Sequence, residues 1–535
     1  MKQTSSALTF LLAQYRAIFK RAYVKGIAAA VLMTAGLAAG QAQAADNFYF
    51  SNSGGTWHMV SETAPADNAM YAQKLGGNAY KDINGAISGD NAVISGGLFN
   101  IGGDSTAKNY LKSVTSGTVT AAYGNAKTGN MTATENHVYV VGSGTVTANG
   151  STTKSRGLIY GAYVTAQAGL AEATKNSVVV AKAQDQNENV AASDGYIGGR
   201  AQGASGATVE GNKVSISGHH ASALQVVNAS DNEYDVIGGI ALHNGKNSSG
   251  TYQANQNIID LQYIQVTEAG AEDKGFNITG GLVSPDGDAE FSVIAQGNEV
   301  TIANSNLATT NSGNLTVKIV GGNSAAALAN GTVTLKNNTV TLDNTTVTKS
   351  GGYSGSLLIA GGATTGLGKT LNQSKSIEAT GNKVVLKATD DKSIGADIIA
   401  GASITNVAQG ANSVTLTATG NSVTVGNNVT VSTDEGLAGA YISASGSAIQ
   451  SLKASNNVVT VKGTVHGDIA AVKFDKNSQN VASGTYIDFS NNKVILESGS
   501  VSDSGSLMGG FGNNSLVDIK AGATYKANNT SQDIA

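Results

Sequence analysis

The stretch SDSGSL (Ser502–Leu507) is the first candidate for chemistry in this sequence. A serine nucleophile needs a histidine base within hydrogen-bond reach and an acidic side chain behind that histidine. Each of the six histidines lies in the N-terminal region or within a repeat described below: His58, His137, His219, His220, His243 and His466. SDSGSL also lies within the repeats. We therefore interpret it as a Ser/Gly turn and assign no catalytic residue.

Other stretches contain residue types that could hold a metal ion. GGFGNNSLV (Gly509–Val517) has the glycine spacing of a calcium-binding nonapeptide, but asparagine stands where that site needs aspartate. His219 and His220 are adjacent, and neighbouring strand residues point to opposite faces, so they would not share a metal. Asp390–Asp391 and QDQNEN (Gln184–Asn189) are interpreted as loop tips. We predict no metal site and no cofactor.

Paired carboxylates at roughly 5–10 Å would be needed for glycoside hydrolysis. Acidic residues are sparse here, and they do not cluster on the repeat. We therefore predict that the protein is not an enzyme. A secreted carbohydrate-active enzyme is the alternative, because that chemistry does occur on repetitive β folds.

The pattern Asn-x-[Val/Ile]-x-[Val/Ile/Leu] recurs along the chain at intervals of 35 to 45 residues. Its ten copies begin at Asn136, Asn176, Asn212, Asn257, Asn298, Asn338, Asn382, Asn421, Asn457 and Asn492. A fixed period of this size is typical of solenoids and propellers. The recurring phrase is therefore a structural module and not an active-site motif.

A second marker, a glycine that follows apolar residues, keeps the same period. It occurs at Gly161, Gly199, Gly239, Gly281, Gly322, Gly362, Gly401, Gly439, Gly467 and Gly510. Each repeat therefore holds a glycine-marked strand and an asparagine-led strand in constant order.

Hydrophobic residues alternate with period two inside each copy, as in NKVVLKA (Asn382–Ala388), which indicates strands. About four short strands fit in one repeat. We interpret a repeat as two coils of about 20 residues, which predicts roughly 20 coils and a rod of about 90–100 Å. Asparagine at the turn would adopt the left-handed conformation and form amide ladders between coils.

The fold predicted is all-β, a right-handed parallel β-helix (solenoid) with repeats of about 40 residues. An antiparallel β-sandwich array would favour modules of about 100 residues. A β-propeller has a similar period, but its blades usually carry aromatic markers, and Trp57 is the single tryptophan.

Composition agrees with a solenoid in an exported protein. The 535 residues include 68 Gly, only 2 Pro and no Cys. Proline would remove a donor from a continuous ladder. Residues 1–44 hold five basic and no acidic residues, so the remainder has 28 basic against 37 acidic residues. An acidic chain is not suited to binding nucleic acid by counter-ion release.

The first residues predict an export signal. Basic residues precede an apolar run (Gly26–Gly40), and AQA (Ala42–Ala44) is a small-x-small cleavage site. We divide the chain into a signal peptide (1–44), an N-terminal cap with irregular coils (45–130), the β-helix repeats (131–515) and a terminal coil or tail (516–535).

With its long basic signal region, its AQA site, its cysteine-free mature part and its Asn/Gly-punctuated repeats, the chain resembles the secreted passenger of bacterial autotransporters. The resemblance implies a partner, an outer-membrane translocator barrel, which this sequence lacks. It also implies display on the surface of a Gram-negative bacterium or release from it. The function expected is that of a non-enzymatic adhesin contacting host glycans, host proteins or sister cells. An exoprotein of a two-partner secretion system is a further alternative.

Overall fold

The computed structural model describes residues 47–526, with gaps, and part of the side chains from residue 91 onward. The gaps are 54–55, 62–69, 76–78, 81–86, 89–90, 96, 102–109, 112, 115–118, 142–144, 147–157, 182–194, 219–223, 229–233, 246–248, 269–275, 310–316, 326, 350–355, 365–374, 408–413, 445–448, 475–485, 504 and 510–511. The predicted signal peptide lies outside the described residues. The predicted segment boundaries stay predictions.

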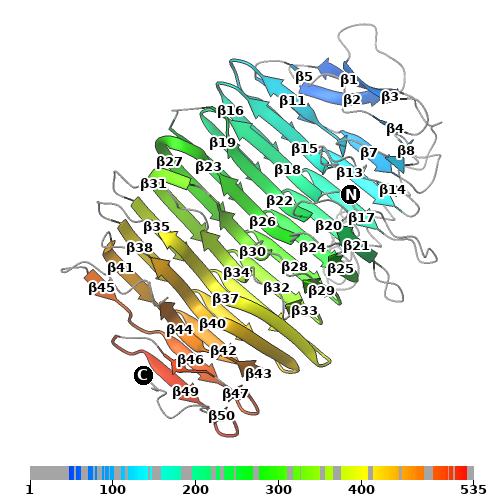
Figure 1. Cartoon of the computed structure of the whole chain (residues 1–535). Coiled ribbons are helices and arrows are strands. Elements are labelled where there is room, and N and C mark those ends of the chain that lie inside the picture. The colour runs from blue at the N-terminus through cyan, green and yellow to red at the C-terminus, as the bar shows by residue number, and fades with distance from the viewer. Residues whose placement is uncertain are drawn as a thin grey trace, which may run out of the picture.

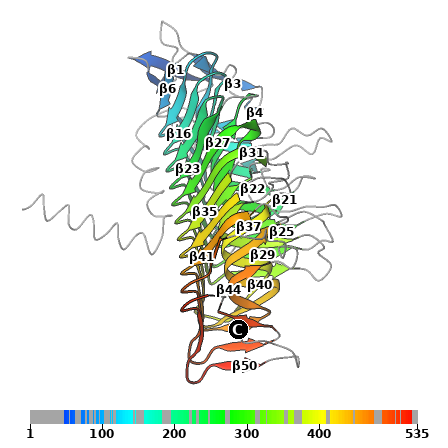
Figure 2. The ribbon, with the colours of Figure 1, turned by 90° about the vertical axis from the view of Figure 1, so that its left-hand side faces the viewer.

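The described chain is a parallel β-solenoid in which strands stack in sequence order from one end to the other (Figure 1). Three large sheets form its faces. The 15-stranded sheet and the 20-stranded sheet follow opposite sides of the stack, as β16, β23 and β41 on one side and β21, β25 and β29 on the other show in Figure 2. No helix that could span a lipid bilayer occurs in the part of the chain that the structure describes.

The 15-stranded sheet contains β1 (Asn47–Ser53), β2 (Thr56–Ser61), β3 (Met70–Leu75), β4 (Ala79–Tyr80), β6 (Ala92–Ser95), β12 (Met131–Thr134), β16 (Leu170–Thr174), β19 (Gly206–Glu210), β23 (Gly250–Asn255), β27 (Asp286–Gln296), β31 (Ala327–Lys336), β35 (Lys375–Thr380), β38 (Val414–Thr419), β41 (Ile449–Ser455) and β45 (Tyr486–Asp488). The 13-stranded sheet contains β7 (Leu98–Ile101), β8 (Tyr110–Leu111), β13 (His137–Val141), β17 (Ser177–Ala181), β20 (Lys213–Ser217), β24 (Ile258–Gln262), β28 (Glu299–Ala303), β32 (Thr339–Asp343), β36 (Lys383–Lys387), β39 (Ser422–Val425), β42 (Val458–Val461), β46 (Lys493–Leu496) and β49 (Leu516–Ile519).

The 20-stranded sheet consists of two ladders. The first ladder contains β21 (Leu224–Asn228), β25 (Ile264–Glu268), β29 (Asn306–Thr309), β33 (Thr346–Lys349), β43 (Thr464–His466), β47 (Val501–Asp503) and β50 (Thr524–Lys526). The second ladder contains β5 (Ile87–Ser88), β10 (Val119–Thr120), β11 (Tyr123–Ala126), β15 (Leu158–Ala166), β18 (Gly195–Gly203), β22 (Tyr234–His243), β26 (Phe276–Ser284), β30 (Val317–Ser324), β34 (Leu357–Thr364), β44 (Ile469–Phe474) and β48 (Leu507–Met508). The long strands β37 (Lys392–Val407) and β40 (Val429–Ala444) run through both ladders, and β9 (Ser113–Val114) pairs separately with β14 (Thr145–Val146).

One repeat makes one turn of the solenoid, and this corrects the expectation of two coils per repeat. Val340 in β32 pairs with Val300 in the preceding repeat and with Val384 in the following one. The four strands of a repeat are present, but all four belong to a single circuit. The number of turns and the rod length are therefore about half of those expected from 20-residue coils.

Antiparallel pairing occurs at the N-terminal end. There β1 pairs with β2 and β3, β3 pairs with β4, and β2 joins β6 in parallel. These strands lie in the segment predicted to be the cap.

The core is a set of apolar columns that run through the stack. Val300, Val340 and Val384 occupy equivalent positions in three turns, and each is fully buried. Inward residues of successive turns thus stack at about the strand spacing of 4.8 Å. The alternating burial of the 13-stranded sheet is the period-two pattern expected from the sequence.

The ten repeat asparagines form one buried ladder. From Asn136 to Asn492 each side-chain Nδ2 donates to Oδ1 of the asparagine in the next turn, over nine links of 2.9–3.1 Å. The second Nδ2 proton goes to a backbone carbonyl, such as Ala295 O for Asn338 at 2.8 Å. Each Oδ1 also accepts a backbone N–H, as Asn382 Oδ1 does from Asn338. Because every donor and acceptor is paired, these amides are buried without an unsatisfied group.

The left-handed residue is not the ladder asparagine, as we expected, but the residue immediately before it. Ten such residues have positive φ: Glu135, Lys175, Gly211, Gln256, Gly297, Asn337, Gly381, Gly420, Asn456 and Asn491. The corner is thus made one residue earlier, which leaves the asparagine side chain free to point inward.

The glycine marker faces the ladder in the five turns from Gly199 to Gly362. A Cβ atom added to Gly281 would lie 2.5 Å from Asn298 Oδ1, and one added to Gly322 would lie 2.5 Å from Asn338 Oδ1. Such distances are shorter than a van der Waals contact allows. In these turns the glycine strand and the asparagine strand depend on each other, whereas Ala162, Ala402 and Ala440 occupy the equivalent position in other turns.

Candidate functional site

The serine candidate has no catalytic arrangement. Ser502 lies in β47, is fully buried, and its Oγ has no hydrogen-bond partner. Its neighbour Asp503 pairs in register with His466 of the preceding turn, and His466 Nδ1 contacts Asp503 Oδ1. Because adjacent strand residues point to opposite faces, this histidine lies on the other side of the sheet from the Ser502 hydroxyl.

The other stretches singled out in the sequence offer no site either. Asp390 and Asp391 are exposed, at the bend before β37. His219–His220 and Gln184–Asn189 lie outside the described residues. Asn514 Nδ2 in the glycine-rich stretch donates to Asn491 Oδ1 at 3.2 Å. The described residues contain no group of three or more His, Cys, Asp or Glu that could hold a metal ion.

The outer face of the second ladder is the surface where unusual side chains gather. Two rows of outward residues run along it, one position per turn. Outer row 1 is Tyr160, Ile197, Ile237, Thr279, Val320, Ala360, Ala400 and Ala438. Outer row 2 is Tyr163, Arg200, Ile240, Leu282, Asn323, Ala363, Ser403 and Tyr441.

Apolar members of these rows form two clusters apart from the main core. The C-terminal cluster contains Val320, Leu358, Ala360, Ala363, Ile398, Ala400, Ala438 and Tyr441. The N-terminal cluster contains Tyr160, Ile197, Ile237 and Ile240. The glycine-marked strands are thus buried on both faces. Each cluster has a charged group beside it, and the two groups differ in their partners.

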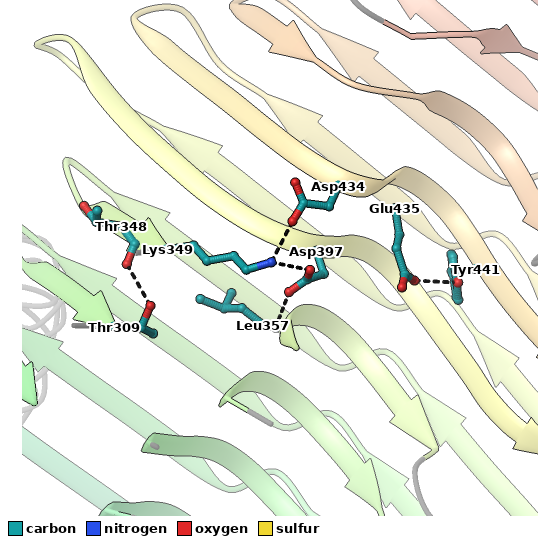
Figure 3. Close-up of polar contacts among 8 residues, drawn as sticks. All are labelled: Thr309, Thr348, Lys349, Leu357, Asp397, Asp434, Glu435 and Tyr441. Atoms are coloured by element: carbon teal, nitrogen blue, oxygen red, sulfur yellow. Dashed lines mark hydrogen bonds and ion pairs between the residues drawn. The ribbon is translucent and has the colours of Figure 1, made fainter. Parts of the chain in front are cut away.

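At the C-terminal cluster, Lys349 binds two carboxylates from the next two turns (Figure 3). Its Nζ lies 2.5 Å from Asp397 Oδ1 and 2.6 Å from Asp434 Oδ2. The other oxygen of Asp397 accepts the backbone N–H of Leu357 at 2.6 Å. Lys349 ends β33 and Leu357 begins β34, so Asp397 of the following turn holds both ends of the connection 350–356.

Further pairs extend this network, which we call the Lys349 cluster. Tyr441 donates its hydroxyl to Glu435 at 2.8 Å (Figure 3), and Lys473 binds Asp468 at 2.6 Å. Asp468 also accepts the backbone N–H of Ser506 at 2.9 Å. Carboxylates therefore do gather on this ladder, and the expectation that acidic residues show no clustering was wrong.

The electrostatics of the Lys349 cluster are those of an ion pair. Burial disfavours the charge on Lys349, but hydrogen bonds and attraction to the two carboxylates outweigh burial and raise its pKa. The hydrogen bond from Lys349 lowers the pKa of Asp434, although partial burial opposes this. A general acid needs a raised carboxyl pKa. The ammonium between the carboxylates therefore favours a structural role for them.

At the N-terminal cluster, Arg200 has no acidic partner among the described residues. Its guanidinium carbon lies 4.4 Å from the centre of the Tyr163 ring. Nη1 is 3.5 Å from the Tyr160 hydroxyl and Nη2 is 3.4 Å from Gln202 Oε1, and Nε is buried without a partner. Both distances lie at the outer limit of hydrogen bonding.

Neither charged group was expected from the sequence, although each leaves a signal there. Asp397 and Glu435 lie four residues before Gly401 and Gly439, at equivalent points of two repeats. Arg200 directly follows the marker Gly199, where the next repeats have Ile240 and Leu282. An alignment of the repeats by their glycines would have shown these charges as outliers.

Comparison with known proteins finds no relative of this chain. No protein-family model, no curated protein and no solved structure matches the chain.

Proposed function

We propose that the protein is an exported, surface-displayed β-solenoid, the passenger of an autotransporter-like system, and acts as a non-enzymatic adhesin. The parallel solenoid with one turn per repeat supports this, together with the export pattern of residues 1–44. An outer-membrane translocator barrel is the partner that this function requires.

The observation that carries the proposal is a constant scaffold with variable connections. Strands stay in register from turn to turn, whereas the connection between the two ladders changes in length. Residues 229–233 separate β21 from β22, residues 310–316 separate β29 from β30, and β37 crosses with no interruption. Binding residues commonly lie on such connections, held by a rigid framework. We assign contacts with host glycans, host proteins or sister cells to these connections and to the outer faces.

The non-enzymatic part of the proposal is supported by the two best catalytic candidates. Ser502 faces the core, and the carboxylates of Asp397 and Asp434 are both paired with the Lys349 ammonium. The acidic balance of residues 45–535 supports partners other than nucleic acid.

Export and display are tested on the source cell. An antibody against the repeats is used to follow the protein while intact cells are treated with a protease. Loss of the band from intact cells is the result expected. A band that stays protected until the outer membrane is opened would overturn surface display.

Adhesion is tested separately with purified protein on cells or glycan surfaces. Variants in which connection 310–316 or 350–356 is replaced by a short Gly/Ser segment should lose binding while the strand spectrum by circular dichroism is kept. Unchanged binding by all connection and outer-face variants would contradict an adhesin.

A further inference from the structure

We propose that Arg200, with Tyr160, Tyr163 and Gln202, forms a binding site for the carboxylate of an acidic saccharide. The inference rests on the proposed function, since it names a partner class for an interaction protein. It concerns one place on the outer face of the second ladder, spanning β15 and β18.

Arg200 has no counter-charge among the residues that the structure describes. Lys349 and Lys473 are two partly buried cations of the same 20-stranded sheet, with side chains 17% and 15% exposed, and both bind carboxylates. Arg200 is half-buried in the same sheet, yet its contacts are a hydroxyl, an amide oxygen and an aromatic ring. Half-burying a charge without a partner is unfavourable. A bound carboxylate would supply that partner.

The second argument is the orientation of the guanidinium. Cation–π contact with Tyr163 places the group over a ring that itself lies 5.3 Å from Tyr123 and 5.4 Å from Tyr160 between ring centres. A guanidinium held in this way keeps its planar set of donors in one place and binds carboxylates in a bidentate manner. Because the present Nη contacts are 3.4 and 3.5 Å, a carboxylate at 2.7–2.9 Å would be a better acceptor.

The third argument favours a saccharide over an acidic peptide. Both polar and apolar groups are present here: the Tyr160 hydroxyl and the Gln202 amide lie beside the charge, and Leu242 and Leu282 are partly buried against the neighbouring cluster. Sugar rings present hydroxyl groups and C–H faces in a similar mixture. Sites for small polar ligands commonly combine an apolar lining with a few convergent polar groups.

The register makes the site single. Along outer row 2, Arg200 is the one charged residue, since tyrosine, isoleucine, leucine, asparagine, alanine and serine occupy the other turns. We therefore expect one carboxylate per chain and not a repeating array of sites.

The test is titration of the purified full chain with a glucuronate-containing disaccharide, followed by calorimetry and ligand-observed NMR. For a ligand of this size we expect a Kd on the order of 1 mM. The Arg200→Gln substitution should weaken binding by about tenfold or more, because a charge-assisted pair is lost. Arg200→Lys should bind at an intermediate level, because it keeps the charge but not the bidentate geometry.

Matched controls decide what a positive result means. Lys383→Gln removes an exposed charge from the 13-stranded sheet and should leave binding unchanged. The neutral disaccharide, with glucose in place of glucuronate, should not bind. Equal binding of the neutral sugar, or equal affinity of Arg200→Gln, would overturn the proposal. If acetate or an acidic peptide competes as well as the disaccharide, the site takes carboxylates in general and the saccharide assignment is wrong.

Folding is followed in the same samples by the thermal midpoint. If Arg200→Gln unfolds, Tyr160→Phe, which removes only the hydroxyl, must weaken binding for the proposal to stand. Absence of binding by the wild-type chain would overturn this site but not the proposed display, because display is measured by protease treatment of cells.

Discussion

Arg200 and Lys349 lie in different turns of the same 20-stranded sheet, and they differ in how their charge is compensated. Lys349 binds carboxylates contributed by the next two turns, and one of these also accepts the Leu357 N–H. Arg200 has an aromatic ring and two long contacts. Each turn of the solenoid has an equivalent position, so the residue in the adjacent turn decides the role of a charged side chain. With an acidic neighbour the charge stabilises the stack of turns, and without one it can bind a ligand. Substitutions at the two places should therefore have opposite consequences.

The largest effect is expected for Asp397→Ala. Removing this carboxylate leaves the Lys349 ammonium with one exposed partner and the Leu357 N–H with none. Breaking a buried pair costs about 3–5 kcal/mol, and we expect about 3 kcal/mol here because Asp434 remains. Hydrogen exchange of strands β33, β34 and β37 measures the loss turn by turn. The matched Asp397→Asn variant keeps an acceptor for the Leu357 N–H, so it should lose less stability than Asp397→Ala. Equal losses of stability would contradict the role of Asp397 in holding both ends of connection 350–356.

Lys349→Met should have the next largest effect. It leaves Asp397 and Asp434 close together without a cation, so the carboxylates repel and one of them takes up a proton more readily. We expect a destabilisation of about 2 kcal/mol at neutral pH, which becomes smaller as the pH is lowered toward 4. A loss that does not depend on pH would mean that packing of the lysine stem, and not its charge, is what matters. Thermal midpoints between pH 4 and 8 make this measurement.

Unlike Asp397→Ala, the Arg200→Leu substitution should change the stability of the protein little. No carboxylate among the described residues is left unpaired by it, and leucine continues the apolar row of Ile240 and Leu282. We expect a change within about 1 kcal/mol in either direction. A loss of several kcal/mol, read by hydrogen exchange of β18 and β22, would mean that Arg200 is a structural element of the cluster and would remove the contrast with Lys349.

The smallest effect is expected from Asp434→Asn and its dependence on pH. Asp434 is 69% exposed, and pairs of this kind contribute up to about 1 kcal/mol. Its folded pKa is below the ordinary value of 3.8, so its contribution is present above that pH and is lost as the pH falls through the folded pKa. The pKa of Lys349 is raised above its ordinary value of 10.5. The stabilisation by the ion pair is therefore fully present below pH 10.5 and is lost as the pH rises through the folded pKa of Lys349.

The measurement is therefore a difference between wild type and Asp434→Asn across pH. It should be constant from about pH 5 to 9 and shrink below about pH 4. Salt should reduce it throughout, since the pair is accessible to solvent. A difference that grows in acid would contradict the assignment of the lowered pKa to Asp434.

Sequence reasoning reached the period, the strand type and the amide ladder, because each depends on a residue type that recurs at a fixed interval. Asn298, Asn338 and Asn382 do stack through their side chains. The same reasoning divided each repeat into two coils. Four strands of similar composition do not reveal whether a chain closes its circuit after two strands or after four, because either choice buries the same alternating residues.

The sequence by itself determined that the protein is a repetitive parallel β-solenoid with asparagine and glycine at matched points of each turn. Only the tertiary structure decided that a turn takes a whole repeat and that the left-handed residue precedes the asparagine. It also decided that Asp397 meets Lys349, while Arg200 meets no acid among the described residues. The physical reason is that periodicity indicates only which face of a strand a residue occupies. Contacts between turns also depend on the register of the strands and on which strands, such as β37, run through both ladders without a loop. Charges on an outer face carry no periodic signal, so their partners are known only once the turns are stacked.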